Sequence, residues 1–168
     1  MKVNLKKSRV YELMIVILFI GIFVNTYSRN TKLKKNIKKE VIAYNKDLNY
    51  KDSISNMIYD LRIKYPHIVL AQILLESNNF KSEVFKENNN PFGFRMPGSR
   101  VTTAKGIRNG YAYYDSLRDA VLDYAFYQTA FYRQVSSEEE YYLTLNKSYS
   151  KDENYISKIK KIANSLKN

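Results

Sequence analysis

The stretch that most constrains the fold is an apolar segment that follows Pro66 and ends at Glu76, with the sequence HIVLAQILLE. Proline suits the first turn of a helix, so a helix is expected to begin there. Apolar residues cover most of the circumference of this helix, which is typical of a helix buried inside a domain. The rest of the chain must therefore supply elements that surround it.

Helical patterns recur on both sides of the buried segment. Helix starts are predicted where residues that favour N-caps precede apolar repeats, at Asp52 or Ser53, Ser116, Ser137 and Asp152. Between these helices the composition changes, since four of the five glycines lie from Gly93 to Gly110. Residues 100–107 and 111–114 there have the pattern of two short strands joined by a turn. The predicted fold class is mainly α with a small β-hairpin lobe.

A second apolar run, LMIVILFIGIFV, lies near the N-terminus between two basic segments. With its flanking residues it reaches about 18 residues, enough for a helix to cross a bilayer core. We therefore expect residues 1–28 to be a cytoplasmic basic segment and a transmembrane anchor, residues 29–51 a basic stem, and residues 52–168 a globular domain. The N-terminus is expected in the cytoplasm. A cleaved signal peptide, which would leave a secreted protein, is the alternative.

The net charge of +12 is unevenly distributed along the chain. Residues 1–51 carry 12 Lys/Arg and 3 Asp/Glu, a net of +9, whereas residues 52–168 carry 16 and 13, a net of only +3. The globular part thus lacks the basic surface that a nucleic-acid partner requires. The chain has no cysteine and a single histidine, so thiolate and multi-histidine metal sites are excluded. We expect neither a metal nor a cofactor.

Glu76 is the candidate catalytic residue. Apolar surroundings disfavour the charged form of a carboxyl group and raise its pKa, which suits a general acid near neutral pH. The local pattern alone is equally compatible with a glutamate that points into water at the end of a helix.

Four ordered motifs extend beyond Glu76. They are Ala71–Ser77 (AQILLES), Asn90–Gly93 (NPFG), Asp115–Tyr124 (DSLRDAVLDY) and Tyr149–Tyr155 (YSKDENY). With them the sequence resembles the glucosaminidase family of peptidoglycan hydrolases, which are endo-β-N-acetylglucosaminidases with a lysozyme-like α+β fold. The resemblance spans about residues 65–165.

The resemblance implies a role for each motif. Glu76 would be the general acid that cleaves peptidoglycan glycan strands after N-acetylglucosamine, and Tyr149 would lie near the reacting sugar. Asn90, Phe92 and Gly93 would shape the floor of the cleft. The aromatic rings suited to stacking on sugars are Tyr111, Tyr113 and Tyr114. The enzyme would act as a monomer, with its catalytic domain outside the cytoplasm.

The sequence departs from the two-carboxylate pattern of most glycosidases. From Gly98 to Tyr114 there is no acidic residue, and the nearest acids are Glu83, Glu87 and Asp115. We therefore expect a substrate-assisted mechanism, in which the N-acetyl group of the sugar serves as the nucleophile and Tyr149 assists. Two other functions stay open, a lytic transglycosylase that uses the same glutamate and a non-catalytic module that binds cell wall.

Overall fold

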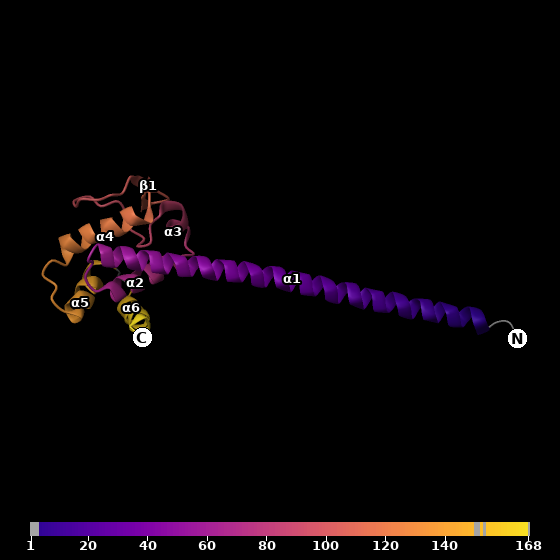
Figure 1. The fold of residues 1–168 in the computed structure, drawn as a ribbon. Helices are drawn as coiled ribbons and strands as arrows, with labels where there is room; N and C mark the ends of the chain where they lie inside the picture. The colour runs from indigo at the N-terminus through magenta and orange to yellow at the C-terminus, as the bar shows by residue number, and fades with distance from the viewer. Residues whose placement is uncertain (1–3, 150–151, 153, 168) are drawn as a thin grey trace. The chain divides into compact units, whose positions relative to one another are not determined.

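The structure is a computed structural model that describes residues 4–149, 152 and 154–167, with the side chains of residues 4–17, 19, 20 and 44 outside that description. Contacts divide the chain into two compact units, Met1–Lys46 and Asp47–Asn168. The elements are α1 (Asn4–Asp60), α2 (Pro66–Glu76), α3 (Glu83–Asn88), β1 (Gly106–Arg108), β2 (Tyr111–Tyr113), α4 (Leu117–Phe131), α5 (Glu138–Ser148) and α6 (Tyr155–Leu166) (Figure 1). The predicted class, mainly helical with a small two-stranded sheet, is confirmed for the described residues.

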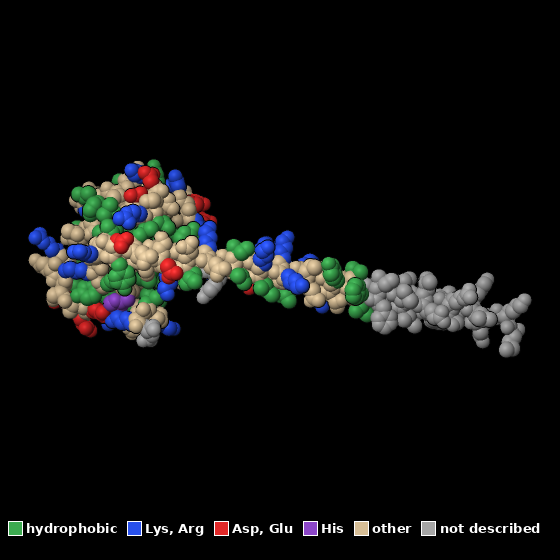
Figure 2. Space-filling view, viewed as in Figure 1, with side chains coloured by type: hydrophobic (Ala, Val, Ile, Leu, Met, Phe, Trp, Pro, Cys, Tyr) green, Lys and Arg blue, Asp and Glu red, His purple; other side chains and the backbone are tan. Residues whose placement is uncertain are grey.

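Helix α1 is continuous across the predicted stem. The basic stem was expected to end before a new helix that begins at Asp52 or Ser53. No proline precedes Pro66 and no glycine lies between Gly21 and Gly93, so nothing in the sequence interrupts the helix there. Its described side chains from residue 21 to residue 43 are all exposed, with apolar and basic groups on the surface seen in Figure 2.

The predicted transmembrane helix is wrong. In the part of the chain that the structure describes, no helix is long and apolar enough to cross a membrane. The unbroken apolar run extends only from Leu13 to Val24. At a rise of about 1.5 Å per residue it covers roughly 18 Å, well short of a hydrocarbon core of about 30 Å. Residues 1–3, at the start of the predicted anchor, lie outside the described residues.

Helix α2 is buried in the second unit, as predicted from its apolar circumference. Its residues from Ile68 to Ile73 are all buried, and α6 packs against it. The surrounding helices contribute side chains that are fully inaccessible to solvent, namely Ile54, Ile58, Val121, Tyr124, Tyr141, Leu145, Ile159 and Ala163. The end of α2, where Glu76 lies, is thereby fixed by packing along the rest of the helix.

Capping residues set the starts of α4 and α5, also as predicted. The Ser116 hydroxyl accepts a hydrogen bond from the Asp119 backbone N–H, and the Ser137 hydroxyl accepts one from Glu140. Asp152 does not cap α6 directly, because Asn154 occupies the N-cap position. The Asp152 carboxylate instead accepts a hydrogen bond from the Asn154 N–H at 2.9 Å.

The β lobe is a tight antiparallel hairpin. Ile107 pairs with Ala112, and the turn residues Asn109 and Gly110 have φ of 53° and 79°. Two positive φ values in a two-residue turn match the right-handed twist of the strands. Strand β1 begins later than predicted, because the preceding segment binds α4 instead, with the Thr103 hydroxyl donating to the Asp119 carbonyl at 2.6 Å. The short helix α3 was not predicted.

Candidate active site

A cleft of about 380 Å³ opens at the carboxyl end of α2. It is lined by Glu76, Phe92, Gly93, Phe94, Arg95, Tyr111, Tyr127, Ser148 and Tyr149. These residues come from α2, the turn after α3, β2, α4 and the end of α5. The cleft therefore collects residues from three of the four motifs that the sequence analysis singled out, with aromatic rings forming much of its wall.

Glu76 is the last residue of α2 and is half-buried in this cleft. Burial raises the pKa of its carboxyl, and the nearby Tyr155 hydroxyl lowers it by a smaller amount. The net result is a carboxyl that holds its proton to a higher pH than an exposed glutamate would. The pKa of Glu76 is thus raised, as predicted from the apolar helix. The alternative, a glutamate that points into water, is excluded because the side chain is half-buried.

A glycine turn passes directly beside the Glu76 carboxyl. Gly93 has a φ of 63°, in the left-handed region that glycine adopts without strain. A Cβ at this position would lie 3.5 Å from Glu76 Oε2, so the backbone of the turn packs against the carboxyl. The preceding residue, Phe92, is 1% exposed and stacks on Tyr124 with 4.3 Å between ring centres. That stacking fixes the turn from beneath.

Tyr149 holds the same turn from the other side. It follows the last residue of α5, and its hydroxyl donates to the Phe92 carbonyl at 2.5 Å. Its ring lies nearly parallel to that of Tyr155, at 5.7 Å between centres. Burial raises the pKa of Tyr149 well above its ordinary value, with Tyr155 and Glu76 adding to the effect. Tyr149 is therefore a neutral hydroxyl group on the wall of the cleft.

Two buried polar groups lie behind Glu76. Gln72, one turn earlier on α2, accepts a hydrogen bond from the Tyr124 hydroxyl at 2.6 Å, and its side chain is near enough to the Tyr155 hydroxyl to lower the pKa of Tyr155. The Tyr155 hydroxyl is likewise buried and without a hydrogen bond of good geometry. It is near enough to Glu76 for the two groups to shift each other's pKa. The Gln72 amide and the Tyr155 hydroxyl are thus buried polar groups close to the Glu76 carboxyl.

Glu76 is the one carboxylate among the described residues that line the cleft. The three acids considered as a second carboxylate lie outside this lining. Glu87 is exposed and accepts a hydrogen bond from Asn109 at 3.3 Å, while Asp115 pairs with Lys105 at 3.2 Å. Glu83 is an exposed residue in the first turn of α3. Among the described residues, the cleft therefore combines a single carboxylic acid, Glu76, with a wall of aromatic rings.

Comparison with known families decides what this arrangement belongs to. A family model named Glucosaminidase, described as mannosyl-glycoprotein endo-beta-N-acetylglucosaminidase, matches residues 61–168. The chain belongs to this family. It is a glycoside hydrolase, and the family predicted from the four motifs is confirmed.

Two solved structures are similar to this glucosaminidase. The catalytic domain of the autolysin Auto from Listeria monocytogenes is 25% identical, with 72% of this chain and 84% of that chain covered at a TM-score of 0.51. A type VI secretion system effector–immunity complex from Pseudomonas protegens is 13% identical, with 72% and 91% covered at a TM-score of 0.58, a likeness of fold alone. A search of curated proteins finds no match.

The other predicted substrate-binding residues divide into two groups. Tyr111 lines the cleft together with Phe92 and Gly93, whereas Asn90, Tyr113 and Tyr114 are absent from its described lining. Asn90 is 1% exposed, and its amide bonds both the N–H and the carbonyl of Phe94. This side chain therefore shapes the glucosaminidase cleft through the backbone rather than by touching a ligand.

The two remaining tyrosines have structural partners. The Tyr113 ring lies under the Arg108 guanidinium at 4.7 Å, and the Tyr114 hydroxyl donates to Asp123 at 2.8 Å. Tyr114 is 3% exposed, so its ring is not available for stacking on a sugar. Alternation accounts only for Tyr114, because successive side chains of an extended strand point to opposite faces. Tyr113 shares a face with Tyr111 and differs from it in its contact with Arg108.

Sequence reasoning missed four residues of the cleft, Phe94, Arg95, Tyr127 and Ser148. Phe94 and Arg95 directly follow the NPFG motif, and Ser148 immediately precedes Tyr149. Proximity to these two motifs was thus an available signal for all three residues. Tyr127 gave no such signal, because its position on α4 matches the spacing of core residues.

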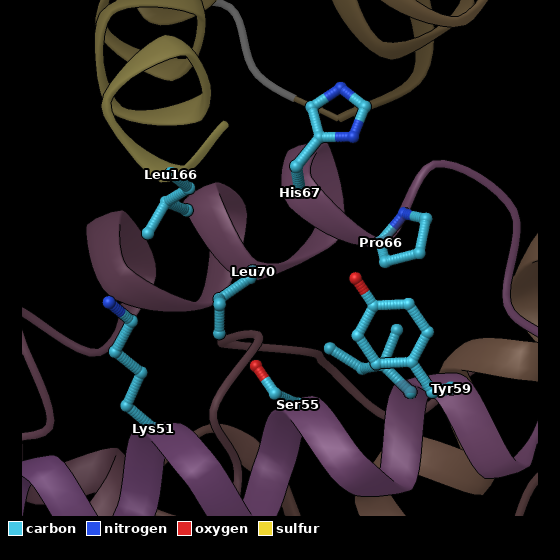
Figure 3. A pocket seen from close by; sticks show the side chains of 8 residues that line it. Lys51, Ser55, Tyr59, Pro66, His67, Leu70 and Leu166 are labelled. Carbon is cyan, nitrogen blue, oxygen red and sulfur yellow. The ribbon is translucent and has the colours of Figure 1, made fainter. Parts of the chain in front are cut away.

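A second, smaller cavity of about 160 Å³ lies away from Glu76 and is bordered by residues of α1, α2 and α6 (Figure 3). His67 lies beside it, with Nε2 3.0 Å from Glu138. Burial lowers the pKa of His67, so the imidazole is mainly neutral at pH 7. Among the described residues no group of acidic residues and histidine could hold a metal ion.

Proposed function

We propose that this glucosaminidase hydrolyses the glycan strands of bacterial peptidoglycan after N-acetylglucosamine, with Glu76 as general acid. The observation that carries the proposal is the half-buried Glu76 carboxyl, with its raised pKa, in a cleft walled by aromatic rings. The autolysin among the similar structures supports a cell-wall substrate. The function places the catalytic part of the chain outside the cytoplasm, where peptidoglycan lies.

The single carboxylate favours substrate assistance. Glu76 would give its proton to the glycosidic oxygen while the acetamido oxygen of the same N-acetylglucosamine attacks its anomeric carbon. Water would then open the resulting ring and return a proton to Glu76. The enzyme needs no second carboxylate for these steps.

Tyr149 would assist by orienting the acetamido group. Its hydroxyl proton is committed to the Phe92 carbonyl, which leaves the oxygen lone pairs free to accept a hydrogen bond. An acetamido N–H donating to that oxygen would hold the group in position and make its carbonyl oxygen more nucleophilic. Tyr149 is therefore the residue that we propose to contact the acetamido group of the reacting sugar.

The products of digestion test the proposed function. Peptidoglycan treated with the full chain, reduced with borohydride and analysed by mass spectrometry should show new chain ends of reduced N-acetylglucosamine. Reduced N-acetylmuramic acid would instead indicate cleavage of the other glycosidic bond, and anhydro ends would indicate a lytic transglycosylase. Binding without release of soluble fragments would indicate a non-catalytic module. Each of these three results would refute the proposal.

The pH dependence should respond to Tyr155. A general acid works only while protonated, so the rate should fall as pH rises through the Glu76 pKa. Since the Tyr155 hydroxyl lowers that pKa, Tyr155→Phe should raise it and move the alkaline limb of kcat/KM to higher pH. Profiles of both proteins would measure the shift. A uniform loss of activity with an unmoved limb would mean that Tyr155 serves packing alone.

A further inference from the structure

The glucosaminidase cleft contains one cation as well as one acid. Among the described residues that line it, Glu76 and Arg95 are the only charged ones. Arg95 follows the glycine turn by two positions, and its guanidinium lies 6.0 Å from the centre of the Tyr111 ring, another part of the cleft wall. The cation is therefore held over a surface on which a sugar could stack.

Arg95 differs from Arg100 and Arg108 in having neither an ion pair nor a side-chain hydrogen bond to another described residue. Arg100 forms a two-pronged ion pair with Asp123, and Arg108 donates to the Glu87 carbonyl. Arg95 is exposed, and no carboxylate of a described residue lies within ion-pairing distance of it. Its guanidinium is thus available for a ligand.

The backbone beneath Arg95 is held firmly in place. The Phe94 N–H donates to Asn90 Oδ1 at 3.1 Å, and the Phe94 carbonyl accepts from both Asn90 Nδ2 and the Ala112 N–H, each at 2.9 Å. Phe94 itself is 8% exposed and packs against Tyr127. The fixed backbone at Phe94 sets the point from which the Arg95 side chain extends, which keeps its guanidinium at the wall of the cleft.

We infer that Arg95 is a specificity-determining residue that binds a carboxylate of the substrate. The inference rests on the proposed function, because peptidoglycan strands carry carboxylates on their stem peptides, or on the lactyl group where no peptide is attached, whereas a plain N-acetylglucosamine polymer carries none. A planar guanidinium matches a carboxylate with two parallel hydrogen bonds. The preferred substrate class is therefore an acidic glycan.

Substrates that differ only in charge test this inference. Soluble peptidoglycan strands, first stripped of phosphate-bearing polymers, are divided into two portions, and the carboxylates of one are converted to methylamides. For the full wild-type chain, amidation should raise KM about five- to tenfold with little change in kcat. Arg95→Gln should show that higher KM on both portions, and Arg133→Gln, which removes an exposed arginine outside the cleft lining, should behave as wild type.

The outcomes distinguish a failure of the proposed function from a failure of the role of Arg95. A wild-type chain that releases no fragments from either portion would refute the proposed function itself. A wild-type chain that cleaves both portions with equal KM would refute the role of Arg95 and leave the hydrolase intact. So would an Arg95→Gln variant that retains the full difference between the portions.

Discussion

Exchange of Glu76 for glutamine should lower kcat on peptidoglycan by about 10²–10⁴-fold, the usual contribution of a general acid. Glutamine has nearly the same size and can still donate a hydrogen bond from its amide, but it cannot transfer a proton to the glycosidic oxygen. KM should change little, because the rest of the cleft is untouched. Release of soluble reducing ends from purified peptidoglycan measures the effect.

The folding stability of this variant supplies an internal control. Burial raises the pKa of Glu76 in the folded state above its value in the unfolded chain. The contribution of Glu76 to stability is therefore largest at low pH and is lost as pH rises and Glu76 ionises. Glutamine cannot ionise, so Glu76→Gln should be at least as stable as wild type at pH 7. If the variant were both inactive and unfolded, the loss of activity would be explained by unfolding rather than by loss of the proton donor.

A matched substitution separates the two possible mechanisms. Glu87→Gln removes an exposed carboxylate outside the cleft lining and should keep nearly full activity. If Glu87→Gln abolished activity while Tyr149→Phe retained it, a two-carboxylate mechanism would replace substrate assistance. The opposite result, with Tyr149→Phe strongly impaired, is the one we expect.

The sequence was most informative where one local pattern governs the structure. The apolar circumference of α2 predicted its burial, and the pair Asn109–Gly110 predicted the hairpin turn, since few residues other than asparagine and glycine accept positive φ there. The position of Glu76 at the end of a buried helix followed directly. These features depend on residues close together in the chain.

Features that depend on distant partners were not predictable in the same way. Asn90 was expected to shape the floor of the cleft, but the partners that hold its amide, the backbone of Phe94 and of Ala112, 22 positions away, could not be predicted from the local sequence. The transmembrane helix was expected from hydropathy together with polar flanking residues, and the described helices lack the required apolar length. Tyr127 reaches the cleft only because α4 and the glycine turn come together in the fold.

The clearest such long-range feature is a buried ion pair between Arg100 and Asp123. Two guanidinium nitrogens donate to the Asp123 carboxylate at 2.7 and 2.8 Å, and the Tyr114 hydroxyl donates to it as well. The Asp123 side chain is fully buried, and that of Arg100 is 9% exposed. The Arg100 guanidinium also lies over the rings of Phe94 and Tyr127, both on the cleft wall.

Arg100→Ala should destabilise the fold by about 3–5 kcal/mol, because it leaves a buried carboxylate without its counter-ion. Urea unfolding can be followed by tyrosine fluorescence, since the chain has 16 tyrosines and no tryptophan. Arg118→Ala, which removes an exposed arginine from the same helix as Asp123, should change stability by less than about 0.5 kcal/mol. Equal effects of the two substitutions would show that the ion pair contributes nothing specific.

The pH dependence of this loss identifies its origin. Burial alone would raise the pKa of Asp123, but hydrogen bonds from Arg100 and Tyr114 outweigh it, so the pKa lies below its usual value. A lowered pKa gives stability that is present above the unfolded-state pKa of about 4 and disappears as pH falls through the folded-state value. The difference between wild type and Arg100→Ala should therefore be large at pH 7 and shrink below pH about 4. A difference that stayed constant with pH would point to lost packing against Phe94 and Tyr127 rather than to the unpaired charge.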